Sequence, residues 1–227
     1  MNFLLKFFAA LCVFIFVVVP LYIKHATYYP SKNFQNISTH HEDVYFTTSD
    51  GVKINAWYSP PMYRNITVVF CHGNGGNLST YQEIFSKLKQ KGFGILAIDY
   101  RGYGKSEGKP SEKGLYEDLR AGIKYLNDVK KTPKSNIVLW GLSLGGAVVS
   151  KIASEDAGYR GVILHSTFTN MKAMVGNVIV ASLPQLSENI STLTNIIPMF
   201  EKYDTKSRIG LIKSPLLITH AAPDDIV

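Results

Sequence analysis

The sequence predicts an α/β fold in which a mostly parallel central sheet is covered by helices on both faces. Apolar, β-rich runs alternate with longer stretches of helical character, as they do when crossover helices join parallel strands. The 227 residues are enough for one such domain with a substantial core. Hydrophobic residues make up 46% of the chain and charged residues 18%, which is ordinary for a globular domain that also carries an apolar segment.

The expected elements follow in a regular order. The chain opens its domain with a hairpin, because strands at 44–48 and 52–58 flank the turn Ser49-Asp50-Gly51. After the hairpin, strands and helices alternate. We expect strands at 66–71, 94–98, 136–140, 161–164 and 215–219, helices at 78–91 and 111–129, and a further helix directly after the 136–140 strand.

One stretch exceeds a simple crossover helix. Residues 166–214 separate the last two strands and contain apolar runs at 173–181 and 196–200, interrupted by Pro184 and Pro198. We interpret 166–214 as a small cap insertion of the 41–227 domain that supplies an apolar pocket for an acyl group. The alternative is an ordinary crossover helix with a packed insertion.

The N-terminal segment predicts a membrane anchor. Residues 7–23 contain no charged side chain, and a helix over 3–23 is about 31 Å long, enough for a hydrocarbon core of about 30 Å. Lys6 can extend toward the headgroups. We therefore expect a single-pass transmembrane anchor at 1–23 and a linker at 24–40 that lifts the domain off the bilayer. A cleaved signal peptide is the alternative, and the flanking lysines do not decide the orientation.

Charge and cysteine content exclude several other classes. The net charge of +7 comes from scattered lysines and arginines, with no long basic run, so we expect no nucleic-acid partner, and contact with an anionic membrane surface fits better. We find no zinc-ligand pattern and expect no metal or cofactor. The two cysteines, Cys12 and Cys71, lie in the apolar N-terminal run and at a core strand end, so no disulfide framework is indicated.

The most informative motif surrounds Ser143. Gly141-Leu142-Ser143-Leu144-Gly145 is a G-x-S-x-G pentapeptide between an apolar strand and an Ala/Val-rich helix. This is the context of a nucleophile elbow, in which a sharp strand-to-helix turn exposes the serine hydroxyl. Side chains two positions before and after the serine would collide, which explains Gly141 and Gly145. Ser143 is therefore the candidate nucleophile.

A second motif follows the 66–71 strand. The run His72-Gly-Asn-Gly-Gly-Asn77 is a glycine-rich loop, which exposes backbone N–H groups at the end of a core strand. An oxyanion hole needs one such N–H together with the N–H of the residue after the nucleophile. We assign these donors to Asn74 and Leu144, with His72 and Gly73 supporting the loop. A phosphate-cradling loop is the alternative, although the run has neither P-loop nor dinucleotide-site spacing.

Together these motifs resemble the α/β-hydrolase superfamily. The matching pieces lie in the family's order and span most of residues 40–227. They are the 72–77 loop, Asp99–Ser106, the elbow, His165–Phe168, and Ser214–His220 followed by Asp224. Within the superfamily the chain is most similar to membrane-anchored serine hydrolases with a serine-aminopeptidase-like core. The resemblance implies an α/β-hydrolase fold, a Ser-Asp-His triad, and hydrolysis of an ester, thioester or amide, but it does not imply a particular substrate. We expect a small-molecule or acylated substrate.

The resemblance also locates the acid of the triad. Asp224 and Asp225 follow the 215–219 strand, and the family pattern implies Asp224, which would orient the catalytic imidazole. Ala221 stands where the family usually has glycine, so the turn can differ. A solvated aspartate pair is the alternative. Asp99 is expected to order the loop that follows it.

The catalytic histidine is the missing member. In the family's order it comes after the acid, and none of the six histidines does so. His165 and His220 end strands near the site, and we interpret both as structural. We therefore expect a chain truncated before its last strand, helix and base, and inactive or impaired as it stands. The predicted function is that of a serine hydrolase, of esterase, lipase, thioesterase or peptidase type, acting through an acyl-enzyme on Ser143. The alternative is a non-catalytic membrane-tethered binding domain.

Overall fold

A seven-stranded sheet runs through the domain. The computed structural model describes residues 2–35, 40–182, 184–189, 192, 194–195 and 202–221, and everything below concerns these residues. The strands lie in the order β2-β3-β6-β4-β7-β8-β9. Their bounds are β2 (Glu42–Thr47), β3 (Lys53–Ser59), β4 (Thr67–Cys71), β6 (Gly94–Ile98), β7 (Ile137–Leu142), β8 (Gly161–His165) and β9 (Leu216–Thr219).

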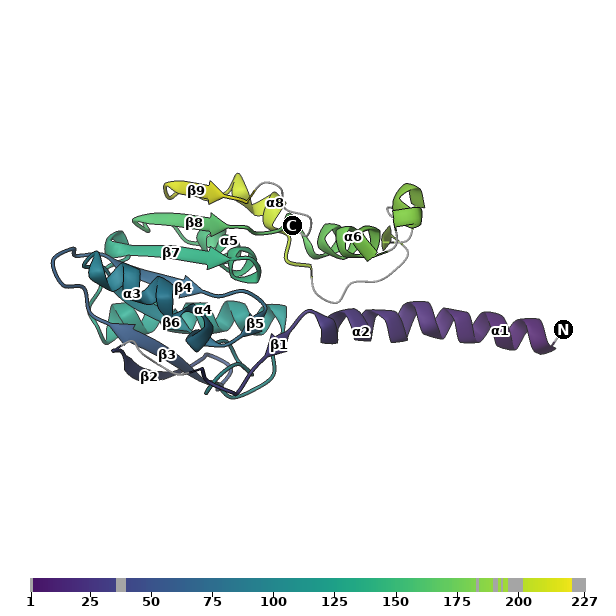
Figure 1. The fold of residues 1–227 in the computed structure, drawn as a ribbon, viewed down its shortest axis with the longest axis horizontal. Coiled ribbons are helices and arrows are strands. Elements are labelled where there is room, and N and C mark those ends of the chain that lie inside the picture. The colour runs from purple at the N-terminus through teal and green to yellow at the C-terminus, as the bar shows by residue number, and fades with distance from the viewer. Residues whose placement is uncertain are drawn as a thin grey trace.

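Strand pairing confirms the predicted fold class. β2 pairs antiparallel with β3, and β3 with β6, while every pair from β6 through β4, β7 and β8 to β9 is parallel. The opening hairpin closes through Thr48, whose Oγ1 accepts the N–H of Val52 at 2.9 Å. Because the parallel strands run the same way, their carboxyl ends meet at one edge of the sheet (Figure 1).

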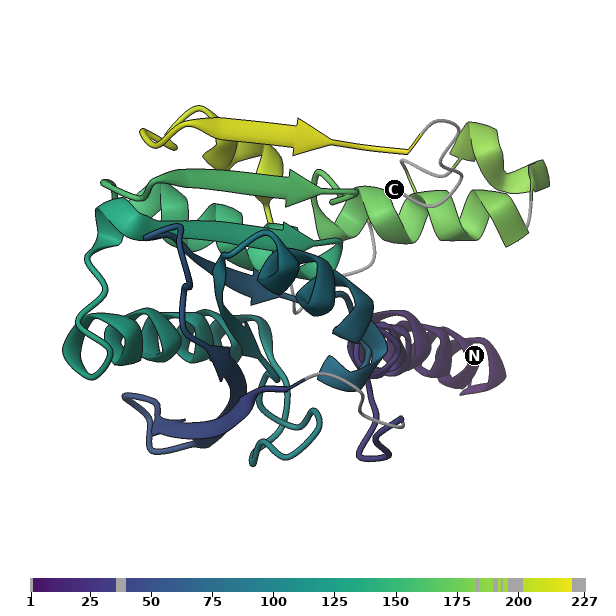
Figure 2. The ribbon, with the colours of Figure 1, turned by 60° about the vertical axis from the view of Figure 1, so that its left-hand side comes forward.

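Helices cover both faces of the sheet (Figure 2). On one face lie the 3₁₀ turn η2 (Leu78–Tyr81) and α3 (Gln82–Gln90), whose Phe85 packs with Trp57 and Phe70. The other face carries α4 (Glu112–Asp128), α5 (Leu144–Glu155) and the short α8 (Thr205–Ile209), and the 3₁₀ turn η3 (Lys134–Asn136) precedes β7. Buried residues of α4 and α5, such as Leu119 and Val148, belong to the larger core cluster. The two clusters pack against the sheet from both faces.

The N-terminal segment is one continuous helical stretch that projects from the domain (Figure 1). It consists of α1 (Asn2–Val13), the π-helical turn η1 (Phe14–Val18) and α2 (Val19–Ala26). Residues Leu5–Tyr22 have a mean hydropathy of 2.4 and are almost entirely unburied. By length and composition, this helix can cross a membrane. It leaves the domain on the side toward which the parallel strands point (Figures 1 and 2).

The residues after this helix lie along the domain. We call residues 27–35 the exit segment. Its strand β1 (Tyr29–Pro30) pairs in parallel with β5 (Gly75–Gly76), which belongs to the glycine-rich loop after β4. The sequence predicts a linker over 24–40. The structure instead continues α2 to Ala26, and the pairing of β1 with β5 attaches the exit segment to the domain.

The region between β8 and β9, where we expect a cap insertion, is described in part. Its described part contains α6 (Met171–Ser182) and the 3₁₀ turn η4 (Pro184–Asn189), which lie on the side of the sheet from which the N-terminal helix projects (Figures 1 and 2). Lys172 is the only charged residue in α6. The apolar run 196–200, a part of the predicted cap, lies outside the described residues.

Candidate active site

Ser143 occupies a strained turn between β7 and α5. Its backbone has φ 50° and ψ −114°, a conformation that a side-chain-bearing residue adopts at a cost of about 1–3 kcal/mol. Three hydrogen bonds hold it there. The Ser143 N–H donates to the carbonyl of His165 at 2.8 Å, and the Ser143 carbonyl accepts from the Gly146 N–H at 2.9 Å and from the Thr167 hydroxyl at 2.8 Å.

The glycines of the elbow are required by contact. A Cβ atom at Gly141 would lie 2.2 Å from the carbonyl oxygen of Gly145, and one at Gly145 would lie 2.0 Å from that of Cys71. Both obstacles are backbone atoms, one of them in β4, so no side-chain movement relieves them. The turn therefore closes only with glycine at both positions, as the sequence predicts.

Leu144 begins helix α5. The first N–H groups of a helix have no partner within it and carry the positive end of the helix dipole. The Leu144 side chain is buried in the core, which anchors this end of the helix beside Ser143. Its N–H is thus a donor available to an anion formed next to the nucleophile.

The loop 72–77, which we call the oxyanion loop, passes beside the nucleophile. A Cβ atom at Gly73 would lie 3.7 Å from the Cβ of Ser143. The ring Nδ1 of His72, which is fully buried, lies 2.7 Å from the Gly73 carbonyl oxygen. Because a peptide unit is planar and trans, fixing the Gly73 C=O directs the Asn74 N–H the opposite way. This contact orients the donor that the sequence assigns to Asn74.

Tyrosines from the loop after β6 support the oxyanion loop. The Tyr100 hydroxyl donates to the His72 carbonyl at 3.0 Å, and the Tyr103 hydroxyl donates to the Asn74 carbonyl at 2.8 Å. Both rings also contact the His72 imidazole. Burial raises the pKa of both tyrosine hydroxyls, so both keep the hydrogen that they donate at neutral pH.

Asp99 ties these two loops together. Its Oδ1 accepts the N–H of Leu78 at 3.1 Å and lies 3.5 Å from Nε2 of His72. The side chains of Asp99 and His72 are both fully buried. A Cβ atom at Gly104 would lie 1.8 Å from Asp99 Oδ2, so the following loop closes tightly over the carboxylate. Asp99 therefore orders the neighbouring loops, as predicted.

A buried ion pair fixes the base of the same loop. The Arg101 guanidinium contacts Asp118 at 2.9 Å, and both of its terminal nitrogens donate to Asp50, at 2.6 and 3.0 Å. The backbone N–H of Arg101 also donates to Asp118 at 2.8 Å. Burial raises the pKa of the Asp118 carboxyl to about 6, against the opposite effect of the Arg101 hydrogen bonds.

His165 and His220, which we expect to be structural, lie at the carboxyl ends of β8 and β9. His165 stacks on Trp140 with ring centroids 6.1 Å apart, and it touches the elbow through its main chain. His220 is exposed after β9. Within the described residues no histidine side chain hydrogen-bonds to Ser143. Asp224 and Asp225 lie outside the described residues.

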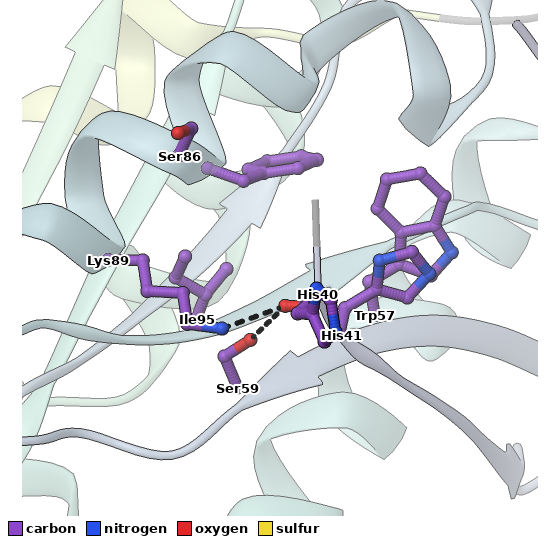
Figure 3. A pocket seen from close by; sticks show the side chains of 8 residues that line it. His40, His41, Trp57, Ser59, Ser86, Lys89 and Ile95 are labelled. Carbon is purple, nitrogen blue, oxygen red and sulfur yellow. Dashed lines mark hydrogen bonds between the residues drawn. The ribbon is translucent and has the colours of Figure 1, made fainter. Parts of the chain in front are cut away.

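Figure 3 shows a separate cavity. It is lined by His40, His41, Trp57, Ser59, Phe85, Ser86, Lys89 and Ile95. His41 stacks on Trp57 with centroids 3.8 Å apart, and the His40 carbonyl accepts from Lys89 Nζ at 3.0 Å. Ile95 is near the amino end of β6, so this cavity lies at the opposite sheet edge from Ser143. We assign it no part in the chemistry at Ser143.

Tyr29, Tyr103 and Thr167 are among the contributors to the site that the sequence did not predict. Tyr29 donates its N–H to the Asn74 carbonyl at 2.9 Å, and Tyr103 and Thr167 hydrogen-bond to the oxyanion loop and the elbow. Thr167 lies within the matching His165–Phe168 motif, so proximity to that motif was a usable signal. Nothing local marks Tyr29, because its role depends on pairing with a loop far along the chain.

The fold and the elbow define an α/β-hydrolase. The chain matches the family described as serine aminopeptidase, S33, over residues 64–202, and it belongs to that family. The protein YfhR of Escherichia coli K12 is 30% identical over 230 residues, covering 97% of this chain and 75% of YfhR. The α/β-hydrolase domain-containing protein WAV2 of Arabidopsis thaliana is 32% identical over 195 residues, covering 82% of this chain and 63% of WAV2. A Saccharomyces cerevisiae relative described as a membrane protein is 36% identical over 137 residues, covering 60% of this chain and 48% of its own length.

Solved structures agree with this assignment. The esterase Pf2001 of Pyrococcus furiosus superimposes with a TM-score of 0.69 at 25% identity, covering 88% of this chain and 77% of the esterase. An esterase domain from Rhodothermus marinus shares the fold alone, with a TM-score of 0.57 at 22% identity, covering 83% of this chain and 78% of that one. The chain is thus a hydrolase of the α/β class, and both of these structural neighbours are esterases.

Proposed function

We propose that the protein is a serine hydrolase that cleaves an ester, thioester or amide through an acyl-enzyme on Ser143. The observation that carries the proposal is the strained Ser143 at the start of α5, with the Gly73–Asn74 peptide beside it. We infer that one hydroxyl and two backbone N–H groups, those of Asn74 and Leu144, serve the same small volume. That combination suits acyl transfer, because the nucleophile and the donors act on the two atoms of one carbonyl.

The proposed reaction has two balanced halves. Ser143 Oγ attacks the carbonyl carbon while its proton passes to a histidine, and the N–H groups of Asn74 and Leu144 stabilise the oxyanion. The tetrahedral intermediate collapses, the alcohol, thiol or amine leaves with that proton, and the acyl group stays on Ser143. Water then attacks in the same way and releases the acid. We propose Asp224 as the acid that orients this histidine.

Labelling with a fluorophosphonate tests the nucleophile. The full-length gene product should be labelled and should hydrolyse p-nitrophenyl acetate. Ser143→Ala should lose labelling and at least about 10³ in kcat, since loss of the nucleophilic serine of a triad costs about 10⁶ in the best-measured case. Equal labelling of the two proteins would reject Ser143. Folded, unlabelled and inactive protein would favour the non-catalytic binding domain instead.

We also propose that α1, η1 and α2 are an uncleaved single-pass anchor. An apolar span of 18 residues at Leu5–Tyr22 supports it, together with a yeast relative described as a membrane protein. The protein should stay in the membrane pellet after carbonate extraction and should keep an amino terminus near Met1. A soluble product beginning after residue 23 would instead identify a signal peptide.

A further inference from the structure

The exit segment pairs directly with the oxyanion loop. The Tyr29 N–H donates to the Asn74 carbonyl at 2.9 Å, and the Ser31 N–H donates to the Gly76 carbonyl at 2.9 Å. The Asn77 side-chain amide returns two bonds, to the carbonyls of Ser31 at 3.1 Å and Asn33 at 2.9 Å. The exit segment thus follows the oxyanion loop residue by residue.

These bonds act on the residue that carries the oxyanion donor. Two peptide units flank the Cα of Asn74. The first is held by the contact between His72 Nδ1 and the Gly73 carbonyl. The second is held at the Asn74 carbonyl, which accepts from both Tyr29 N–H and Tyr103 Oη. With both planes fixed, the direction of the Asn74 N–H is fixed too.

The exit segment is itself held on its other side. The Tyr28 hydroxyl lies 2.7 Å from that of Tyr203, and both rings are buried. The Ser31 carbonyl also accepts the N–H of Gly104, in the loop that closes over Asp99. Because Tyr203 and Gly104 also hold the exit segment, it can fix the position of the oxyanion loop, which an unattached linker could not do.

The exit segment is also the first part of the chain after the membrane helix. Helix α2 ends at Ala26, and Tyr29 is only three residues farther on, which an extended chain spans in about 10 Å. The loop that would stabilise the transition state is therefore attached almost directly to the anchor. One short pair of strands, β1 and β5, therefore connects the proposed anchor to the proposed oxyanion loop.

We propose that the exit segment is a positioning element of the active site, acting through Tyr29 and Ser31. Their backbone N–H groups hold the oxyanion loop so that the Asn74 N–H points at the carbonyl attacked by Ser143. This rests on the proposed hydrolase function. The exit segment touches no substrate and contributes by keeping a donor in place, which affects the transition state more than substrate binding.

Backbone variants of the full gene product test this role. Tyr29→Pro removes the N–H, whereas the matched variant Tyr29→Ala keeps it and removes only a largely exposed ring. Ser31→Pro and Ser31→Ala form a second pair. The measurements are kcat and KM on p-nitrophenyl acetate, with kcat expressed per site titrated by the fluorophosphonate, so that unfolded protein does not count.

Each proline variant should have a kcat about tenfold below that of its alanine partner, with KM within about twofold. In the double variant Tyr29→Pro/Tyr103→Phe, kcat should fall by more than the product of the two single-variant factors, because both hydrogen bonds hold one carbonyl.

Equal kcat per titrated site in the proline and alanine variants would overturn the positioning role, even if the proline variants melt earlier. A double loss equal to the product would overturn the shared hold on Asn74. Equal hydrolysis by the unaltered protein and Ser143→Ala would instead reject the hydrolase function itself.

Discussion

The elbow at 141–145 and the oxyanion loop at 72–77 lie side by side, but they are held in different ways. The elbow also forms hydrogen bonds with His165 and Thr167, but it closes only because its own glycines let β7 and α5 approach the β4 backbone. The oxyanion loop depends on hydrogen bonds from distant segments, namely Tyr29 and Ser31 before β2 and Tyr100 and Tyr103 after β6. A tight turn is thus set by local shape, whereas an open loop needs partners from elsewhere.

The largest effect is expected from a methyl group added to the elbow. Gly145→Ala places a Cβ 2.0 Å from the Cys71 carbonyl oxygen, whereas Gly75→Ala in the oxyanion loop meets nothing within 4 Å. Gly145→Ala should cost at least about 3 kcal/mol of unfolding free energy, the upper end of ordinary overpacking. The reason is that the atoms it meets, in Cys71 and His72, belong to the backbone. Gly75→Ala should stay within about 1 kcal/mol. Urea unfolding of both variants measures this, and equal costs would remove the contrast between the two loops.

The next effect concerns the donor in the oxyanion loop. Asn74→Pro removes the N–H, while Asn74→Ala retains it. Loss of one oxyanion donor costs about 10²–10³ in kcat, so the proline variant should fall by that factor relative to the alanine variant. Hydrolysis of p-nitrophenyl acetate by the full gene product measures it, with circular dichroism as the folding control. Full activity in Asn74→Pro would place the hole elsewhere.

A smaller, pH-dependent effect should come from the ion pair beneath the supporting loop. Burial raises the pKa of Asp118 from 3.8 to about 6, so the folded state binds this proton more tightly than the unfolded state does. The resulting stabilisation is fully present below pH 3.8 and is lost as pH rises through about 6. Compared with Asp118→Asn, the unaltered protein should therefore gain up to about 3 kcal/mol between pH 7 and pH 4. Urea unfolding at several pH values measures the difference, and parallel curves would mean that Asp118 has no raised pKa.

Much of the fold was predictable because its signals are local. The strand ending at Leu142 and the helix starting at Leu144 follow from an apolar run, a G-x-S-x-G motif and an Ala/Val-rich segment. The hairpin around Gly51 follows from turn chemistry, and Gly51 indeed adopts a positive φ of 84°. The order of the strands did not follow, since β6 lies between β3 and β4 although it comes later in the chain.

The residues of the candidate site likewise include some that the sequence could predict and others that it could not. Ser143, Gly141 and Gly145 could be assigned from the motif because a tight turn restricts which residues fit. The partners of Asn74 could not, because hydrogen bonds between Tyr29, Tyr103 and the oxyanion loop join residues far apart in sequence. The acid at Asp224 stays a prediction, since it lies outside the described residues.

By itself the sequence determined the fold class, the elbow and an apolar N-terminal helix, because each is encoded by residue pattern over a few turns or strands. Only the tertiary structure decided that the residues leaving that helix pair with the oxyanion loop. Backbone N–H and C=O groups are the same in every residue except proline, which lacks the N–H, so no side-chain pattern predicts which distant strand will pair with them. The fold brings Tyr29 to Asn74, and the open carbonyls of the loop accept the bonds.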